Sequence, residues 1–112
     1  MSISRTDHTP ALDGSDRRTV IVDQSFFIHL WEDRTRGEQW VPSYDTKGLA
    51  LLSDEFLRIA SNNAVENGQR IFEFKAVQSG IYDLIFEKRM GWKFTAEDRR
   101  LFKIEAEPSS EN

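Results

Sequence analysis

The stretch Phe86-Glu87-Lys88-Arg89-Met90-Gly91-Trp92-Lys93-Phe94 connects two segments in which apolar and polar residues alternate. Before it, Gly80–Phe86 has the period-two pattern of a β-strand, and after it Arg100–Ala106 has the same pattern. A hairpin needs only about two to five residues to reverse the chain. A longer connection that carries a Trp either folds back over the core as a lid or extends towards a partner.

The same alternation recurs along the chain and predicts an all-β fold. Further strands are predicted at Arg18–Val22, Ser25–Trp31, Trp40–Tyr44 and Arg70–Val77. Pro42 confines the third of these strands to an edge or a bulge. Short strands separated by turn signals are typical of an antiparallel sandwich or a small barrel.

The segment Gly48–Ala60 fits two structures. Leu52, Phe56 and Ile59 have helical spacing, whereas Phe56, Leu57 and Ile59 also fit a strand that faces apolar surroundings on both sides. Local propensity slightly favours the helix and leaves helix or strand open at residues 50–60. The surrounding β pattern favours the strand.

The chain has the length and composition of one folded domain. Its 112 residues are 38% apolar and 12% aromatic, which is enough for a single core. Residues 1–17 are polar and are predicted to form a flexible leader, residues 18–107 the domain, and residues 108–112 a frayed tail.

The composition also restricts partners and compartment. The chain has no Cys, so it has neither disulfides nor a thiolate metal site. It shows no signal peptide and no membrane span, which favours a cytoplasmic protein and leaves an exported form open. The net charge of −4 gives no bulk attraction to nucleic acid or to a membrane surface.

The sequence offers no group of residues that is suited to catalysis. His8 lies in the leader and His29 is predicted to be a partly buried strand residue, so no nucleophile–base pair or His metal site is expected. The carboxylates all fit the solvent side of strands or loops, and no Gly-rich phosphate loop is present. The sequence predicts no enzyme, no metal and no cofactor.

Three loops remain as candidates for binding. They are the polar first loop (Asp33–Gln39), the second loop (Asn67–Gln69), whose Asn-Gly pair is a strong turn signal, and the third loop (Lys88–Lys93). Alternate loops of a sandwich collect at one end. We therefore expect the three to lie side by side.

These loops resemble those of the chagasin-like inhibitors of papain-type cysteine proteases. The first loop of that family carries Asn-Pro-Thr-Thr-Gly before an aromatic pair ending in Trp, and Asp33–Trp40 matches this run. The Gly-Gly pair of the second family loop matches Asn67-Gly68, and the Arg-Pro-Trp of the third matches Arg89–Trp92. The similarity covers roughly Thr19–Ala106.

The chain also departs from the family pattern. Arg34 and Arg36 replace the Pro and the second Thr of the first loop, and Glu38 replaces the aromatic residue after the Gly. The third loop lacks the Pro and is one residue longer. Either Lys88 or Arg89 can therefore take the position of the family's Arg.

The resemblance implies a monomeric immunoglobulin-like sandwich of about seven to eight strands that reversibly inhibits a papain-like cysteine protease. By position, the backbone of the first loop would lie against the catalytic Cys and His, the second loop over the non-primed subsites, and the Trp on the opposite side. The protease-binding residues that it implies are Asp33, Arg34, Thr35, Arg36, Gly37, Asn67, Gly68, Gln69, Arg89, Gly91 and Trp92.

Two other functions use the same residues. In a non-inhibitory structural or interaction module, Trp92 would be a core lid. A binder of an acidic polysaccharide or single-stranded nucleic acid would use the Trp and the Arg residues, but such a platform needs more exposed aromatic residues.

The charges of the loops predict a slightly basic end of the sandwich, which would suit a protease cleft with an acidic rim. The basic residues are Arg34, Arg36, Arg70, Lys88, Arg89 and Lys93, and the acidic residues are Asp33, Glu38, Glu66 and Glu87.

Overall fold

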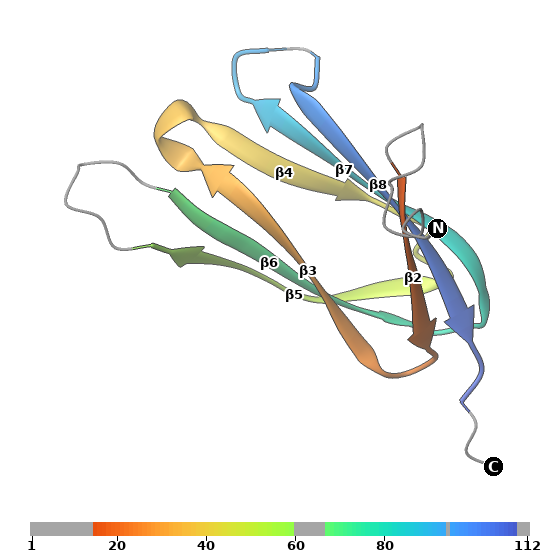
Figure 1. Cartoon of the computed structure of the whole chain (residues 1–112). Coiled ribbons are helices and arrows are strands. Elements are labelled where there is room, and N and C mark those ends of the chain that lie inside the picture. Colours follow the sequence, from red (N-terminus) through yellow and green to blue (C-terminus); the bar gives the residue numbers. More distant parts are fainter. Residues whose placement is uncertain (1–14, 60–66, 94, 110–112) are drawn as a thin grey trace, which may run out of the picture.

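Two β-sheets pack face to face in the computed structural model, which describes residues 15–59, 67–93 and 95–109 (Figure 1). One sheet has the strand order β2-β8-β7-β4 and the other β3-β6-β5. A short 3-10 helix, η2 (Arg34–Arg36), joins β3 to β4. The strands are β2 (Ser15–Ile21), β3 (Ser25–Asp33), β4 (Glu38–Ser43), β5 (Leu49–Arg58), β6 (Asn67–Ala76), β7 (Gly80–Met90) and β8 (Asp98–Glu107).

The predicted all-β, immunoglobulin-like sandwich is confirmed, with one difference in strand direction. Each paired neighbour is antiparallel except β2, which runs parallel to β8. The strand β2 begins at Ser15, so the last residues of the predicted leader take part in the sheet. The rest of that leader and residues 110–112 of the predicted tail lie outside the described residues.

The segment that fitted both a helix and a strand is the strand β5. It pairs with β6 along its length, with a bulge between Leu51 and Ser53. Leu49 is fully buried, but Leu52 and Ile59 of the helical pattern are 47% and 42% exposed. The strand forms because pairing with β6 satisfies the backbone of this segment, and this tertiary pairing overrides the local helix propensity.

Aromatic rings from both sheets form the centre of the core. Phe72 of β6 lies 4.8 Å from Phe86 of β7 between ring centroids, and Phe102 of β8 meets Phe86 edge-on at 5.7 Å. Truncation of Phe86 to Ala should therefore cost about 3–5 kcal/mol of unfolding free energy. The buried cluster comprises Val20, Ile28, Leu30, Trp40, Leu49, Phe72, Phe74, Ala76, Leu84, Phe86, Phe102, Ile104 and Ala106.

The strand β7 is longer than the sequence predicts. The pattern ends it at Phe86, but it pairs with β8 as far as Lys88 and with β4 as far as Met90. Met90 is 5% exposed and continues the inward face of Leu84 and Phe86. Lys88 interrupts that apolar pattern, and its ammonium lies 5.5 Å from the ring centroid of Trp40. The third loop is therefore shorter at its N-terminal side than predicted.

Candidate functional site

The three candidate loops gather at one end of the sandwich, where β3, β5 and β7 end (Figure 1). Asp33 of the first loop is the register partner of Asn67 of the second. Nη2 of Arg36 lies 3.9 Å from Oε1 of Glu97, which immediately precedes β8. The structure therefore brings the three loops together, as the sequence predicted.

The first loop is a single capped turn. The side chain of Asp33 accepts a 3.1 Å hydrogen bond from the backbone N–H of Thr35, and this caps η2 at its start. At its end, Gly37 adopts a left-handed conformation with φ of 78° and donates its N–H to the carbonyl of Arg34. A residue with a Cβ is strained at such a φ, so Gly37 sets where the turn ends.

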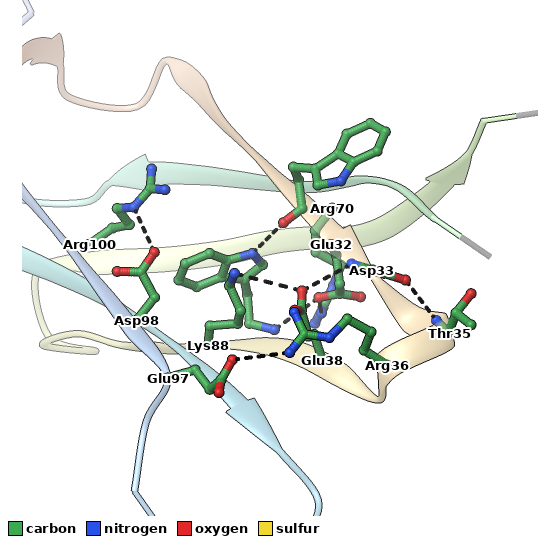
Figure 2. Close-up of polar contacts among 12 residues, drawn as sticks. Glu32, Asp33, Thr35, Arg36, Glu38, Arg70, Lys88, Glu97, Asp98 and Arg100 are labelled. Atoms are coloured by element: carbon green, nitrogen blue, oxygen red, sulfur yellow. Dashed lines mark hydrogen bonds and ion pairs between the residues drawn. The ribbon is translucent and has the colours of Figure 1, made fainter. Parts of the chain in front are cut away.

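A buried carboxylate, Glu32, supports this turn from within the sandwich (Figure 2). Its Oε1 accepts hydrogen bonds from the backbone N–H of Trp40 at 2.9 Å and from Nη1 of Arg70 at 2.7 Å. Its Oε2 accepts a 2.8 Å hydrogen bond from Nε of Arg34. One carboxylate thus ties together β4, β6 and the first loop.

Arg70 completes this buried network. Its Nε and Nη2 donate to the two carboxylate oxygens of Asp54 at 2.7 and 2.9 Å, in a bidentate pair. The hydrogen bond with Asp54, together with the charges of Glu32 and Asp54, outweighs burial and raises the pKa of Arg70. The network therefore links β3, β5 and β6 directly beneath the loops.

A second buried carboxylate, Glu38, holds the other side of the first loop (Figure 2). Its Oε2 accepts a 2.9 Å hydrogen bond from Nη1 of Arg36, and its Oε1 accepts a weaker one from the backbone N–H of Asp33 at 3.3 Å. Nζ of Lys88 lies 3.7 Å from the same Oε1. Each Arg of the turn is therefore paired with its own buried Glu.

The sequence pattern misses these two glutamates, because it assigns the carboxylates to the solvent side. Glu32 is fully buried and Glu38 is 5% exposed. The available signal is their position in the alternation: Glu32 follows Ile28 and Leu30 on the inward face, and Glu38 precedes Trp40 by two residues.

Trp92 projects from the third loop. Its side chain is 71% exposed, and Nζ of Lys93 lies 5.0 Å from its ring centroid. Of the two alternatives for Trp92, the exposure of its side chain favours the one that extends towards a partner over the core lid. A Cβ added at the neighbouring Gly91 would have nothing within 4 Å, so this end of the loop is open.

The third loop is closed by its own polar contacts. The backbone N–H of Lys93 donates to the carbonyl of Met90 at 3.0 Å, and that of Glu97 donates to the carbonyl of Lys88 at 2.7 Å. Nζ of Lys93 donates a 2.7 Å hydrogen bond to Glu97. This hydrogen bond, with the charges of Lys93, Arg36 and Lys88, lowers the pKa of the Glu97 carboxyl.

The predicted tight turn at Asn67-Gly68 is wrong, because both residues lie in β6. Gly68 pairs with Glu32 on one side and Arg58 on the other. A Cβ at Gly68 would lie 2.1 Å from the carbonyl oxygen of Leu57. The glycine therefore permits a close approach of β5 rather than a chain reversal.

The remaining candidate residues lie in strands. Gln69 also belongs to β6, and its Oε1 lies 3.3 Å from Nδ1 of His29, which is exposed rather than partly buried as predicted. Arg89 lies in β7 opposite Gln39, and its Nη1 donates to Glu87 at 2.8 Å. Lys88 points to the opposite face, towards Glu38.

The predicted basic end is not supported by the pairing of its charges. Each of the six basic side chains has an acidic partner within 4.0 Å. The pairs are Arg34–Glu32, Arg36–Glu38, Arg70–Asp54, Lys88–Glu38, Arg89–Glu87 and Lys93–Glu97. The predicted set of charges omits Glu32, Asp54 and Glu97, and of these Asp54 reaches this end only through the pairing of β5 with β6.

The residues in 15–59, 67–93 and 95–109 offer neither a metal site nor a membrane-spanning helix. Within these ranges no three His, Asp or Glu side chains are grouped so that they could hold a metal ion. No helix in the same ranges has the length and apolar character needed to cross a membrane.

Three solved structures share this fold. The crystal structure of the cysteine protease inhibitor EhICP2 from Entamoeba histolytica has a TM-score of 0.75 at 13% identity, over 85% of this chain and 89% of that chain. The solution structure of Amebosin has a TM-score of 0.67 at 20% identity, over 86% and 93%. PbICP-C, solved in complex with falcipain-2, has a TM-score of 0.66 at 9% identity, over 83% and 88%.

Sequence comparison gives the family. A search of curated proteins finds no match. The sequence model described as chagasin family peptidase inhibitor I42 matches residues 19–106, which is most of the chain and includes all three loops. The chain therefore belongs to the chagasin family of peptidase inhibitors.

Proposed function

We propose that this protein reversibly inhibits papain-like cysteine proteases by inserting the loop end of the sandwich into the active-site cleft. Membership of the chagasin family of peptidase inhibitors supports the class of target. The inhibitory unit is the sandwich from β2 to β8, which begins at Ser15, three residues before the predicted domain of residues 18–107.

The exposure of Trp92 is the observation that carries this proposal. A Trp that is 71% exposed leaves most of its side chain available to a partner. A Trp side chain buries about 150–250 Å² on binding, and central Trp residues are frequent hot spots of interfaces. We propose that Trp92 packs on one side of the protease cleft.

The rigidity of the first loop supports the same role. The cap of Asp33 and the salt bridges of Glu32 and Glu38 hold the turn before any partner arrives. A preformed loop loses little conformational entropy on docking. We propose that the backbone of Thr35–Gly37 lies against the catalytic Cys and His, in a conformation that the enzyme does not cut.

The second and third loops then flank the first. Asn67, Gly68 and Gln69 would run along the non-primed side of the cleft, joined to the first loop through the register of Asn67 with Asp33. Trp92 and Arg89 would lie on the other side. The order of these loops along the end of the sandwich agrees with a wedge that fills a groove from side to side.

A non-inhibitory module is the competing function. Its main support is the interpretation of Trp92 as a lid, which the exposure of that side chain contradicts. Binding of an acidic polymer is also less favoured, because the basic side chains of this end are engaged with carboxylates.

The test is inhibition of papain and of a cathepsin L-type enzyme by the wild-type protein, Trp92→Ala and Ile81→Ala. Ile81 is 69% exposed at the opposite end of β7 and is the matched control. We expect tight reversible inhibition that weakens about tenfold or more in Trp92→Ala and is unchanged in Ile81→Ala. A folded wild-type protein that inhibits neither enzyme would refute the proposal.

A further inference from the structure

The loop end of the sheet β3-β6-β5 has charged side chains on its inner face and large apolar side chains on its outer face. The face towards the other sheet carries the charged side chains of Glu32, Arg70 and Asp54. The outer face of the same strands carries Trp31 and Leu57. A solvated sheet normally places apolar residues inside and polar ones outside. At this end the inner face carries the charged cluster beside Leu30 and Phe56, and large apolar side chains lie on the outer face as well.

The strand register places the outer apolar residues at one level of the sheet, on either side of β6. Trp31 is the partner of Gln69, and Gln69 is the partner of Leu57 on the next strand. The backbone N–H of Ile59 donates to the carbonyl of Asn67, which extends the β5–β6 pairing by one step. We call Trp31, Leu57 and Ile59 the apolar ledge.

The ledge is open to solvent. Trp31 is 52% exposed, Leu57 55% and Ile59 42%. Large apolar side chains that cluster on a surface, and whose removal from water would be favourable, mark interaction sites. The fold does not require them there, because the core lies on the other face of the sheet.

We infer that the apolar ledge is a further contact surface for the inhibited protease, outside its cleft and on the side of the second loop. This inference rests on the proposed function. The ledge encloses Gln69 and adjoins Asn67, two residues of the second loop, and Asn67 is paired with Asp33 of the first. A protease that receives these loops must therefore approach the ledge. The fitting partner is a papain-like enzyme with an apolar surface beside its non-primed subsites.

The deciding experiment compares Trp31→Ala and Leu57→Ala with Phe27→Ala. Phe27 lies on the same outer face of β3, four residues from Trp31 and away from the loops, and is 45% exposed. Inhibition constants and dissociation rates are measured with papain and a cathepsin L-type enzyme. The thermal unfolding of each variant is recorded alongside, because a half-exposed side chain should be removable without unfolding.

We expect Trp31→Ala to weaken inhibition about tenfold, mainly through faster dissociation, and Leu57→Ala about threefold. Phe27→Ala should remain within about twofold of the wild type. Should Trp31→Ala fail to fold, Leu57→Ala alone decides. Wild-type inhibition by both ledge variants, while Trp92→Ala is weakened, would overturn the ledge and leave the proposed function intact.

Two further outcomes would also overturn the inference. Absence of inhibition by the wild-type protein would remove the proposed function and the ledge with it. Sedimentation velocity provides the other outcome: a wild-type dimer that Trp31→Ala converts to a monomer would show that a second copy of this chain covers the ledge instead.

Discussion

Nη1 of Arg36 donates a 2.9 Å hydrogen bond to Oε2 of Glu38, across the left-handed Gly37 that lies between them in the chain. Both residues depart from the chagasin-like pattern, which has a Thr and an aromatic residue at these positions. The cation at one position pairs with the anion at the other. In this chain the ion pair therefore helps to fix the shape of the first loop.

This pair should contribute to inhibition through the shape of the loop. We expect Glu38→Gln and Arg36→Met each to weaken inhibition of papain several-fold, because either change frees the turn that enters the cleft. The double variant should be no weaker than the worse single variant, since residues in contact show coupling energies of about 0.5–3 kcal/mol. The measurement is a double-mutant cycle on the inhibition constants.

A distant ion pair is the control for that cycle. Nζ of Lys103 lies 2.8 Å from Oδ1 of Asp83, towards the opposite end of β7. Lys103→Met should leave the inhibition constant unchanged. Strictly additive effects of Glu38→Gln and Arg36→Met would contradict a joint role.

The strands with clean alternation could be predicted from the sequence. Phe72, Phe74 and Ala76 of β6 are all fully buried, as their period of two indicated. The pattern failed where one polar residue stands on the inward face. The continuation of β7 to Met90 was not predicted, because the charge of Lys88 breaks the apolar alternation. The side chain of Lys88 nevertheless lies on the inward face, with its ammonium 5.5 Å from the ring centroid of Trp40.

The polar part of the site was beyond sequence reasoning for a different reason. A Glu is rarely buried unless it is paired, and of the two cationic partners of Glu32, Arg34 is nearby in the chain but Arg70 is 38 residues away. Similarly, Asn67-Gly68 is a strong turn signal by itself, but pairing with both β3 and β5 overrides it. Such contacts depend on strand order, which the local pattern does not contain.

Glu32 should be important for stability. We expect Glu32→Ala to lower the free energy of unfolding by about 1–3 kcal/mol, because it leaves the N–H of Trp40 and Nη1 of Arg70 without their buried acceptor, although Asp54 still pairs with Arg70. Urea unfolding at neutral pH measures this loss. Glu73→Ala, on the outer face of β6, should cost about 1 kcal/mol or less. Equal losses in the two variants would contradict a special role for Glu32.

The two loop glycines should respond differently to a methyl group. Gly68→Ala would place a Cβ 2.1 Å from the carbonyl oxygen of Leu57, so β5 and β6 must separate at the second loop. We expect lower thermal stability and weaker inhibition in this variant. Gly91→Ala meets nothing within 4 Å and should be tolerated in folding. Thermal unfolding of both variants checks the contrast, and a Gly68→Ala protein as stable as the wild type would disprove the close packing.

Glu97 should keep the third loop closed under mildly acidic conditions. The hydrogen bond from Lys93, followed by the charges of Lys93, Arg36 and Lys88, lowers the pKa of this carboxyl below its ordinary value of 4.5. A group with a lowered pKa stabilises the folded state above its ordinary pKa, and this contribution is lost as the pH falls through the lowered value. The contact should therefore persist from neutral pH to about pH 5.

A carboxyl NMR titration should give a lowered pKa for Glu97 in the wild type and a pKa closer to the ordinary value of a Glu in Lys93→Met. Lys103→Met should leave the pKa of Glu97 where it is in the wild type. If Lys93→Met also left it there, Lys93 would not be the group that closes the loop.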